Sequence, residues 1–172
     1  TTSNKGNDNN PVYSPDVKYI AYRMMPRTGF EADRQEVMLY DRATGTTKSL
    51  TGALDRSAGD MVWSPASDRL YFTAEDQGRA GIYTASIKGG DAQKLTGKTH
   101  NSALQISSDG KTLVFVRQAI HRPSEVWAMN NDGRNERQLT HANDALLAQL
   151  EMNPVEEFSS DGPGGVKVHS LM

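Results

Sequence analysis

The sequence predicts an all-β fold built from repeated units, and three observations carry this prediction. A short apolar segment ending in Ser opens each repeat, at Ser14, Ser64 and Ser107. Each opener leads into an apolar strand, and each repeat closes on a Leu-Thr dipeptide, these dipeptides lying 45 and 44 residues apart. Several short strands at such a period are typical of β-propeller blades. Because a closed ring takes about four to eight blades, we expect a partial β-propeller of about three four-stranded blades.

Each repeat is predicted to contain an opening turn, two inner strands and a Gly-containing hairpin. In the turn, Pro presets φ and Ser or Asp binds local amides. The strands are rich in Tyr, Phe, Val and Ile, and we expect them at 18–24, 36–42, 70–75, 81–86, 112–117 and 124–129. The expected blades cover 12–52, 61–97 and 104–140. The side chains expected to be buried between blades are Tyr22, Leu39, Trp63, Tyr71, Ile82, Leu113, Phe115 and Val126.

Both ends of the chain depart from this repeat. Residues 1–10 are polar and rich in turn formers, which predicts a loop or the end of a preceding blade. Residues 144–149 predict about one and a half helical turns. A Gly-rich turn at 161–165, between two short strand patterns, predicts a hairpin outside the repeat. We therefore expect the propeller to occupy residues 1–150, and residues 151–172 to cross into a second domain.

Composition excludes several classes of function. A formal net charge of −2 gives no electrostatic basis for binding nucleic acid or an anionic membrane. No run of about 18 apolar residues is present. The absence of Cys excludes disulfides and thiolate metal sites but identifies no compartment; a periplasmic or secreted location is favoured over a cytoplasmic one.

The familiar catalytic motifs do not occur in this chain. It has no Gly-x-Ser-x-Gly elbow, P-loop, Gly-x-Gly-x-x-Gly or His-Glu-x-x-His. Ser107 lies in a Ser-Ser-Asp-Gly segment, but its repeat equivalents Ser14 and Ser64 indicate a structural turn. The four His residues have no spacing that suggests a metal site. We therefore predict no catalytic residue, metal or cofactor in this chain.

One polar cluster stands out, in the insertion between the two inner strands of the first repeat. Here Phe30 is followed by Glu31, Asp33 and Arg34. Two carboxylates and a guanidinium beside an aromatic ring have the chemistry to hold a peptide amine and its carbonyl by charge-assisted hydrogen bonds. The alternative is a local salt bridge that fastens the insertion to its own blade. Both interpretations stay open at this stage.

Several segments, taken in order, resemble a known family. Tyr13–Asp16 and Gly29–Arg34 resemble late propeller blades of the prolyl oligopeptidase-family serine peptidases, in the dipeptidyl peptidase V and acylaminoacyl peptidase-like branch. Glu125–Trp127 and Arg137–Asn143 are similar to the last blade of that group. Val155–Phe158 resembles its crossover into the first strand of an α/β-hydrolase domain, which this chain does not contain.

The resemblance implies a longer serine peptidase in which the propeller restricts access to a Ser-Asp-His triad located beyond Met172. Such an enzyme would hydrolyse short peptides, releasing dipeptides or N-terminal residues. Glu31 or Asp33 would hold the substrate amine and Arg34 would orient them or bind a carbonyl. The implied partners are the peptide and the remaining domain and blades, or a second copy of the chain. Val17 departs from the family, which usually has Gly after Ser-Pro-Asp.

Two other classes of protein share the repeat. A non-enzymatic propeller of the periplasmic Tol type would act by binding other proteins. A stand-alone propeller fragment would assemble with copies of itself. The binding propeller would not need the charged insertion or a crossover after the last blade. A Gly-x-Ser-x-Gly motif beyond Met172 would identify the peptidase.

Overall fold

The computed structural model describes residues 4–172, and the first repeat forms a separate antiparallel sheet in the order β1-β2-β3-β4. We call this sheet the first unit. Its strands are β1 (Asp8–Tyr13), β2 (Tyr19–Met24), β3 (Glu36–Asp41) and β4 (Thr47–Ser49). The strand β1 begins before the predicted blade, so residues 8–10, expected in a loop or a preceding blade, belong to this sheet.

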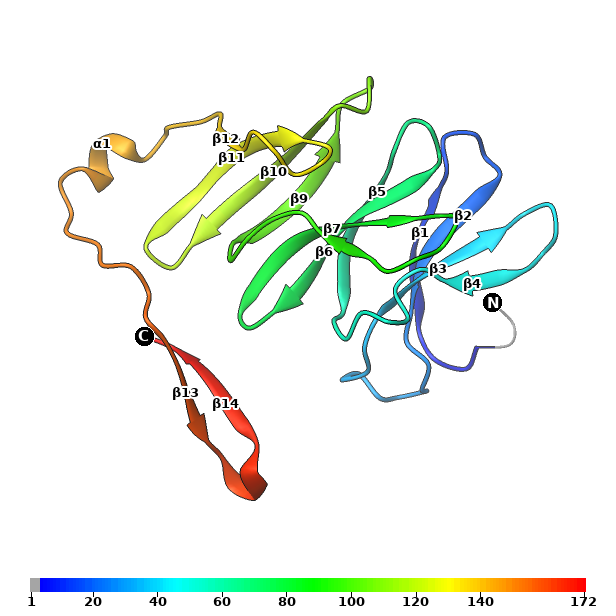
Figure 1. Ribbon diagram of the computed structural model, residues 1–172, viewed down its shortest axis with the longest axis horizontal. Coiled ribbons are helices and arrows are strands. Elements are labelled where there is room, and N and C mark those ends of the chain that lie inside the picture. Colours follow the sequence, from blue (N-terminus) through cyan, green and yellow to red (C-terminus); the bar gives the residue numbers. More distant parts are fainter. Residues whose placement is uncertain (1–3) are drawn as a thin grey trace.

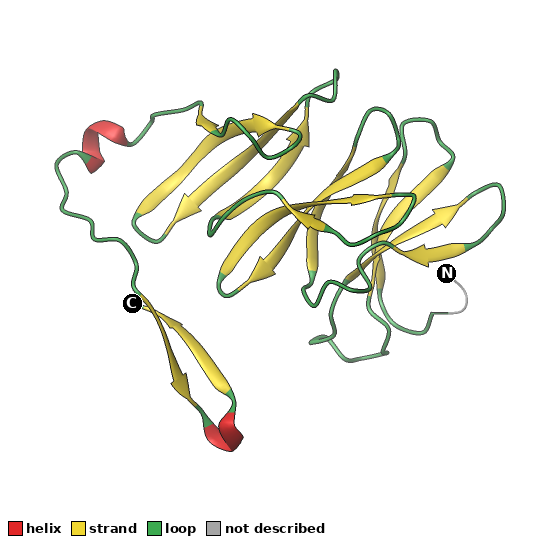
Figure 2. Ribbon diagram, viewed as in Figure 1, coloured by secondary structure: helices red, strands yellow, loops and turns green. Residues whose placement is uncertain are grey.

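The second and third repeats each contribute four further strands to one eight-stranded sheet (Figures 1 and 2). The second unit comprises β5 (Ala58–Trp63), β6 (Arg69–Asp76), β7 (Arg79–Ser86) and β8 (Gln93–Lys94). The third unit comprises β9 (His100–Ile106), β10 (Thr112–Ala119), β11 (Arg122–Asn130) and β12 (Arg137–Gln138). Within each unit neighbouring strands are antiparallel, and the two units join where Ala80 of β7 pairs in parallel with His100 of β9.

All six inner strands predicted from the sequence are confirmed, and the fold is nearly all β. In the part of the chain that the structure describes, helix is limited to α1 (Asp144–Leu147) and a 3-10 turn at Pro163–Gly165. The predicted C-terminal hairpin is also present, as β13 (Glu157–Asp161) and β14 (Lys167–Leu171). It forms a two-stranded sheet of its own, separate from the sheets of the three units (Figure 1).

Two hydrophobic clusters join the units. Phe72 of β6 packs between the first and second units with a group that includes Leu39. The next residue toward the N-terminus, Tyr71, packs between the second and third units with Leu113 and Phe115. Consecutive residues of β6 therefore fill different clusters, because side chains alternate between the two faces of a strand.

Two of the predicted core residues need correction. Tyr22 is buried but lies outside both clusters. Val126 is only half-buried, and the prediction of its burial was wrong. Val126 pairs with Val116 on the face of the third unit opposite the Phe115 cluster, and Val116 is half-buried as well. The other six predicted core residues are buried.

The closing Leu-Thr dipeptide has one structural role in all three units. The Thr hydroxyl accepts a hydrogen bond from a backbone N–H in the third strand of its unit. The N···Oγ1 distance is 2.9 Å for each of Thr51, Thr96 and Thr140. In the first unit the amide belongs to Val37, just beyond the residues that β4 pairs with. The hydroxyl thus satisfies a backbone donor where the short outer strand ends.

Candidate functional site

The insertion between β2 and β3 is held by an ion pair that the sequence did not single out. The Asp33 side chain is only 6% exposed and forms a salt bridge with Arg27. The Arg27 Nε lies 2.9 Å from each carboxylate oxygen, and the backbone N–H of Arg27 donates to Asp33 at 3.1 Å. The Arg27 guanidinium also lies 3.8 Å from the centre of the Phe30 ring. Hydrogen bonds from Arg27 lower the pKa of Asp33, so this carboxylate stays ionised and paired with Arg27.

Arg34 fastens the insertion to the loop that follows β4. Its Nη1 donates to the Leu54 carbonyl at 2.7 Å, and its Nη2 donates to the Gly52 carbonyl at 3.3 Å. The same guanidinium pairs with Glu36 at the start of β3. These contacts agree with the alternative interpretation of the cluster, in which a local salt bridge fastens the insertion to its own blade.

Glu31 has a different environment from its two neighbours. Its side chain is exposed, and within residues 4–172 it has no hydrogen bond or ion pair. The insertion therefore places Glu31, Asp33 and Arg34 on one loop without joining them into one network. Of the three, Glu31 is the carboxylate available to a ligand, and its binding of a substrate amine stays a prediction.

The insertion lies at the same end of the molecule as the C-terminal hairpin (Figure 1). The β6–β7 and β10–β11 turns also point toward this lower end, whereas the Ser-containing turns lie at the opposite end.

The Ser residues of the repeated turns are committed to the turns themselves. The Ser107 hydroxyl donates to Asp109 at 2.6 Å and accepts the amide hydrogen of Thr112 at 3.0 Å. Ser14 makes the corresponding contacts with Asp16 and Tyr19. A hydroxyl that donates to a carboxylate and caps a strand amide is placed as a structural group, in agreement with the repeat argument.

A cavity of about 1000 Å³ lies between the third unit, α1 and the segment that leads to β13. Trp127, Leu147 and Met152 are among its lining residues. Glu125, which also lines the cavity, is buried and accepts hydrogen bonds from the Thr140 hydroxyl and from the backbone and side chain of Asn143. The hydrogen bond from Thr140 is the main cause of the lowered pKa of Glu125.

The role of Glu125 was missed, although its segment carried part of the family resemblance. It ties the end of the third unit to the residues just before α1. A carboxylate beside apolar strand residues is the signal that could have found it, because a buried charge needs several hydrogen-bond donors.

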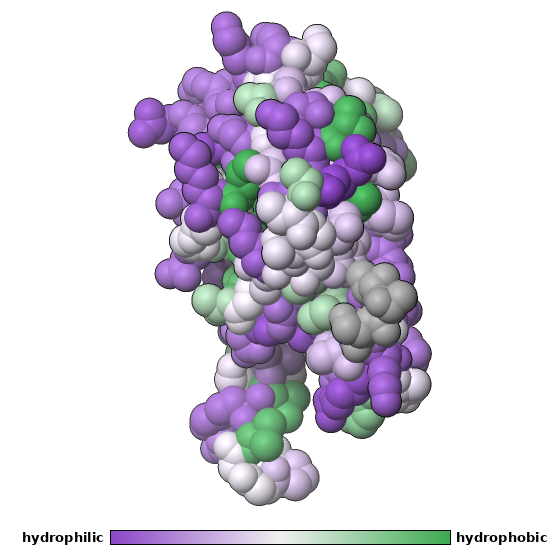
Figure 3. All heavy atoms as spheres, turned by 90° about the vertical axis from the view of Figure 1, so that its right-hand side faces the viewer, coloured by the Kyte–Doolittle hydropathy of each residue, from purple (hydrophilic) through white to green (hydrophobic). Residues whose placement is uncertain are grey.

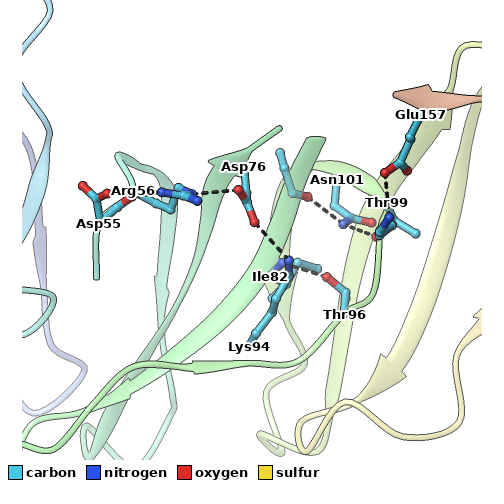
Figure 4. Close-up of polar contacts among 11 residues, drawn as sticks. Asp55, Arg56, Asp76, Ile82, Lys94, Thr96, Thr99, Asn101 and Glu157 are labelled. Atoms are coloured by element: carbon cyan, nitrogen blue, oxygen red, sulfur yellow. Dashed lines mark hydrogen bonds and ion pairs between the residues drawn. The ribbon is translucent and has the colours of Figure 1, made fainter. Parts of the chain in front are cut away.

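A buried polar group also joins the second and third units. The Asn101 side chain, 1% exposed, donates to the Ala80 carbonyl and to the Thr99 hydroxyl, both at 2.8 Å (Figure 4). Its Oδ1 accepts from Arg117 Nε at 2.9 Å. Because all its polar atoms have partners, Asn101 is a structural connector and not a vacant binding group.

Within residues 4–172, no three His, Asp or Glu side chains gather as metal ligands. None of the helices in the described part of the chain is long and apolar enough to cross a membrane.

Four-stranded antiparallel units that share hydrophobic cores define a protein of the β-propeller class. The chain belongs to the TolB β-propeller domain family, whose model matches residues 1–147. Dipeptidyl-peptidase 5 from Porphyromonas gingivalis is 27% identical over 145 residues, covering 84% of this chain and 21% of that protein. A probable dipeptidyl-peptidase 5 from Emericella nidulans is 31% identical over 163 residues, which cover 92% of this chain and 21% of that protein. The resemblance to this peptidase group is thus confirmed, and the chain spans about a fifth of the length of these relatives.

Solved structures agree on the fold. Acylaminoacyl peptidase from Pyrococcus horikoshii superimposes with a TM-score of 0.72 at 20% identity, covering 90% of this chain and 23% of that one. A putative TolB from Agrobacterium tumefaciens superimposes with a TM-score of 0.62 at 19% identity, covering 78% of this chain and 50% of that one. At these identities the similarity establishes the propeller-type fold alone.

Proposed function

We propose that this chain is the propeller portion of a serine exopeptidase that hydrolyses short peptides and releases dipeptides or N-terminal residues. The observation that carries this proposal is the extent of the peptidase match. The TolB-type family model ends at residue 147, whereas the alignment with dipeptidyl-peptidase 5 of Arthroderma otae covers 96% of the chain. That alignment must include most of the segment that contains the β13–β14 hairpin.

In this proposal the chain gates access and does not catalyse. The reacting Ser, with its Asp and His, would belong to a hydrolase domain entered after the hairpin. The position of the insertion, at the same end as the hairpin, supports a role beside the substrate (Figure 1). Glu31 would bind the free amine of the peptide, while the Arg27–Asp33 pair and Arg34 keep the insertion in place.

The half-buried outward faces of the first and third units support the same assembly. A propeller unit normally packs against a neighbour on each face, since each repeat buries its core by stacking. We propose that further units of a longer chain cover these faces. A second copy of this chain is the alternative cover.

The test uses the longer protein that contains this chain. A chromogenic dipeptide substrate with a free N-terminus should be cleaved, and a serine-directed phosphonate should abolish the cleavage. The N-acetylated form of the same substrate is the control, because it separates recognition of a free amine from acylaminoacyl peptidase activity. A protein with no phosphonate-reactive Ser would contradict the proposal.

A non-enzymatic, protein-binding propeller of the Tol type is the second candidate. It is favoured by the family model, which covers residues 1–147 and stops before the β13–β14 hairpin. That lower coverage, compared with the peptidase alignments, is what places it second. Stable capture of another protein by a chain without a reactive Ser would support it.

A further inference from the structure

The β13–β14 hairpin contacts the three units through few groups. Its strands pair with one another along their whole length and form no strand pairing with the units. The residues that connect it to α1 are mostly exposed. The side chains of Phe158, Val168 and Met172 are also exposed, so these apolar residues do not attach the hairpin to the units. Some other contact must fix its position.

That contact is made by Glu157. Its two carboxylate oxygens bind different cations: Arg79 Nη2 lies 2.6 Å from Oε1, and Lys98 Nζ lies 2.6 Å from Oε2. Glu157 is labelled in Figure 4. His169 of the paired strand lies 3.6 Å away. The Glu157 side chain is 22% exposed, and the hydrogen bond from Lys98 is the main cause of its lowered pKa.

The two cations come from the place where the second and third units meet. Arg79 begins β7, and the next residue, Ala80, pairs with His100 of β9. Lys98 lies in the connection from β8 to β9. Beside these cations, Leu171 of β14 approaches the position of Gly78 in the β6–β7 turn. One carboxylate therefore bridges the hairpin to both sides of this junction.

The preceding residue, Glu156, provides a natural contrast. It is exposed, and the contacts it makes are backbone hydrogen bonds with Met172 at 2.8 and 2.9 Å. Its carboxylate has no partner among the described residues. Of these two adjacent glutamates, Glu157 binds cations of the units through its carboxylate, whereas Glu156 makes backbone contacts alone.

We infer that Glu157 is a positioning residue that clamps the β13–β14 hairpin to the junction of the second and third units, and that Glu156 has no part in this clamp. Because two cations act on one carboxylate, removing its charge releases both contacts at once. The position of the hairpin relative to the units is then no longer fixed.

The chain has no Cys, so two introduced Cys residues carry spin labels at the chosen sites alone. Lys88→Cys, in the exposed β7–β8 turn, and Ser160→Cys, in exposed β13, report the distance between the second unit and the hairpin. We expect a narrow distance distribution in this double-Cys chain and with Glu156→Gln. With Glu157→Gln, the distribution should broaden.

Hydrogen exchange supplies a second readout that does not depend on labels. Exchange of peptides covering residues 148–172 should rise about five- to tenfold in Glu157→Gln, while peptides from β6 and β7 stay unchanged. Lys98→Gln should give a smaller rise, since Arg79 still holds the carboxylate. An Arg79→Gln change should add little to Glu157→Gln, because the same contact is already lost.

Equal distance distributions for Glu157→Gln and the double-Cys parent would overturn the inference. Equal broadening by Glu156→Gln and Glu157→Gln would also overturn it, because the effect would then follow net charge. If Glu157→Gln changed the exchange of β6 and β7 as much as that of the hairpin, Glu157 would stabilise the whole fold and the positioning role would fail.

Discussion

The second and third units have similar strands but differ in burial. The central residues of β6 and β7 are buried on both faces of the sheet. In β10, Leu113 and Phe115 are buried while the intervening Val114 and the following Val116 are half-buried. The difference does not arise from side-chain hydrophobicity, because Val is as apolar as the residues it alternates with. A face of a unit is buried only when another unit packs against it.

The first unit shows the same asymmetry on its opposite side. Leu39 faces the second unit and is buried, whereas Met38 and Tyr40, on the other face of β3, are half-buried. Figure 3 views this side of the molecule, where near-neutral side chains occupy the middle of the face and hydrophobic ones are scattered among the hydrophilic ones around it. The two terminal units therefore present surfaces suited to a neighbouring unit.

The largest expected effect comes from the unit covered on both sides. Phe72→Ala should lower the free energy of unfolding by about 3–5 kcal/mol, because it leaves a cavity between two units. Val116→Ala, on the uncovered face, should cost about 1 kcal/mol or less. Urea denaturation of the two variants measures both values. Similar losses would break the comparison, and a larger Val116→Ala effect in a longer protein would show that a neighbour covers this face.

The insertion offers a test that separates binding from stability. In the longer peptidase proposed above, Glu31→Gln should raise KM for a free-amine dipeptide substrate about ten- to a hundredfold, with little change in Tm. Asp33→Asn should instead lower Tm, because it weakens the contact with Arg27, and should leave KM much closer to that of the parent. Wild-type KM in Glu31→Gln would show that the amine is bound elsewhere.

Self-association tests the exposed faces directly. We expect the 172-residue chain to associate as concentration rises, and Met38→Lys or Val116→Lys to weaken this association by placing a charge on an outward face. Sedimentation velocity over a concentration series measures it, with Thr44→Lys in an exposed turn as the matched control. A parent chain that stays monomeric throughout would contradict the expectation.

The smallest expected effect distinguishes the three opening turns. Val17, Ser67 and Gly110 all have positive φ at the same turn position, at 61°, 58° and 71°. Val17→Gly should stabilise the chain by about 0.5–1 kcal/mol, because a β-branched residue is strained in this conformation. Thermal unfolding measures the change.

Ser67→Gly is the control for this last prediction. The buried Ser67 hydroxyl accepts the Asp16 amide hydrogen at 3.0 Å and so links the turns of two units. Its loss should cancel any gain from relieved strain. Equal stabilisation by Val17→Gly and Ser67→Gly would show that this hydroxyl contributes nothing.

The sequence by itself determined the local structure of each unit. The Ser turns were correctly predicted because their hydrogen bonds form between residues close along the chain, as Ser14 does with Asp16 and Tyr19. The inner strands were correctly placed because alternation and β-branched residues act over short segments. The same local pattern limited the site prediction to one loop containing Glu31, Asp33 and Arg34.

Only the tertiary structure decided which carboxylates have a cationic partner and which faces of the units are covered by another unit. Alternation assigned Val126 to a face of its strand, but whether a unit covers that face depends on packing between units. Asp33 is neutralised by Arg27, and Glu157 is held by cations from a distant junction, whereas Glu31 and Glu156 remain exposed. Adjacent carboxylates look alike in a sequence, because the partners that distinguish them are brought close by the fold.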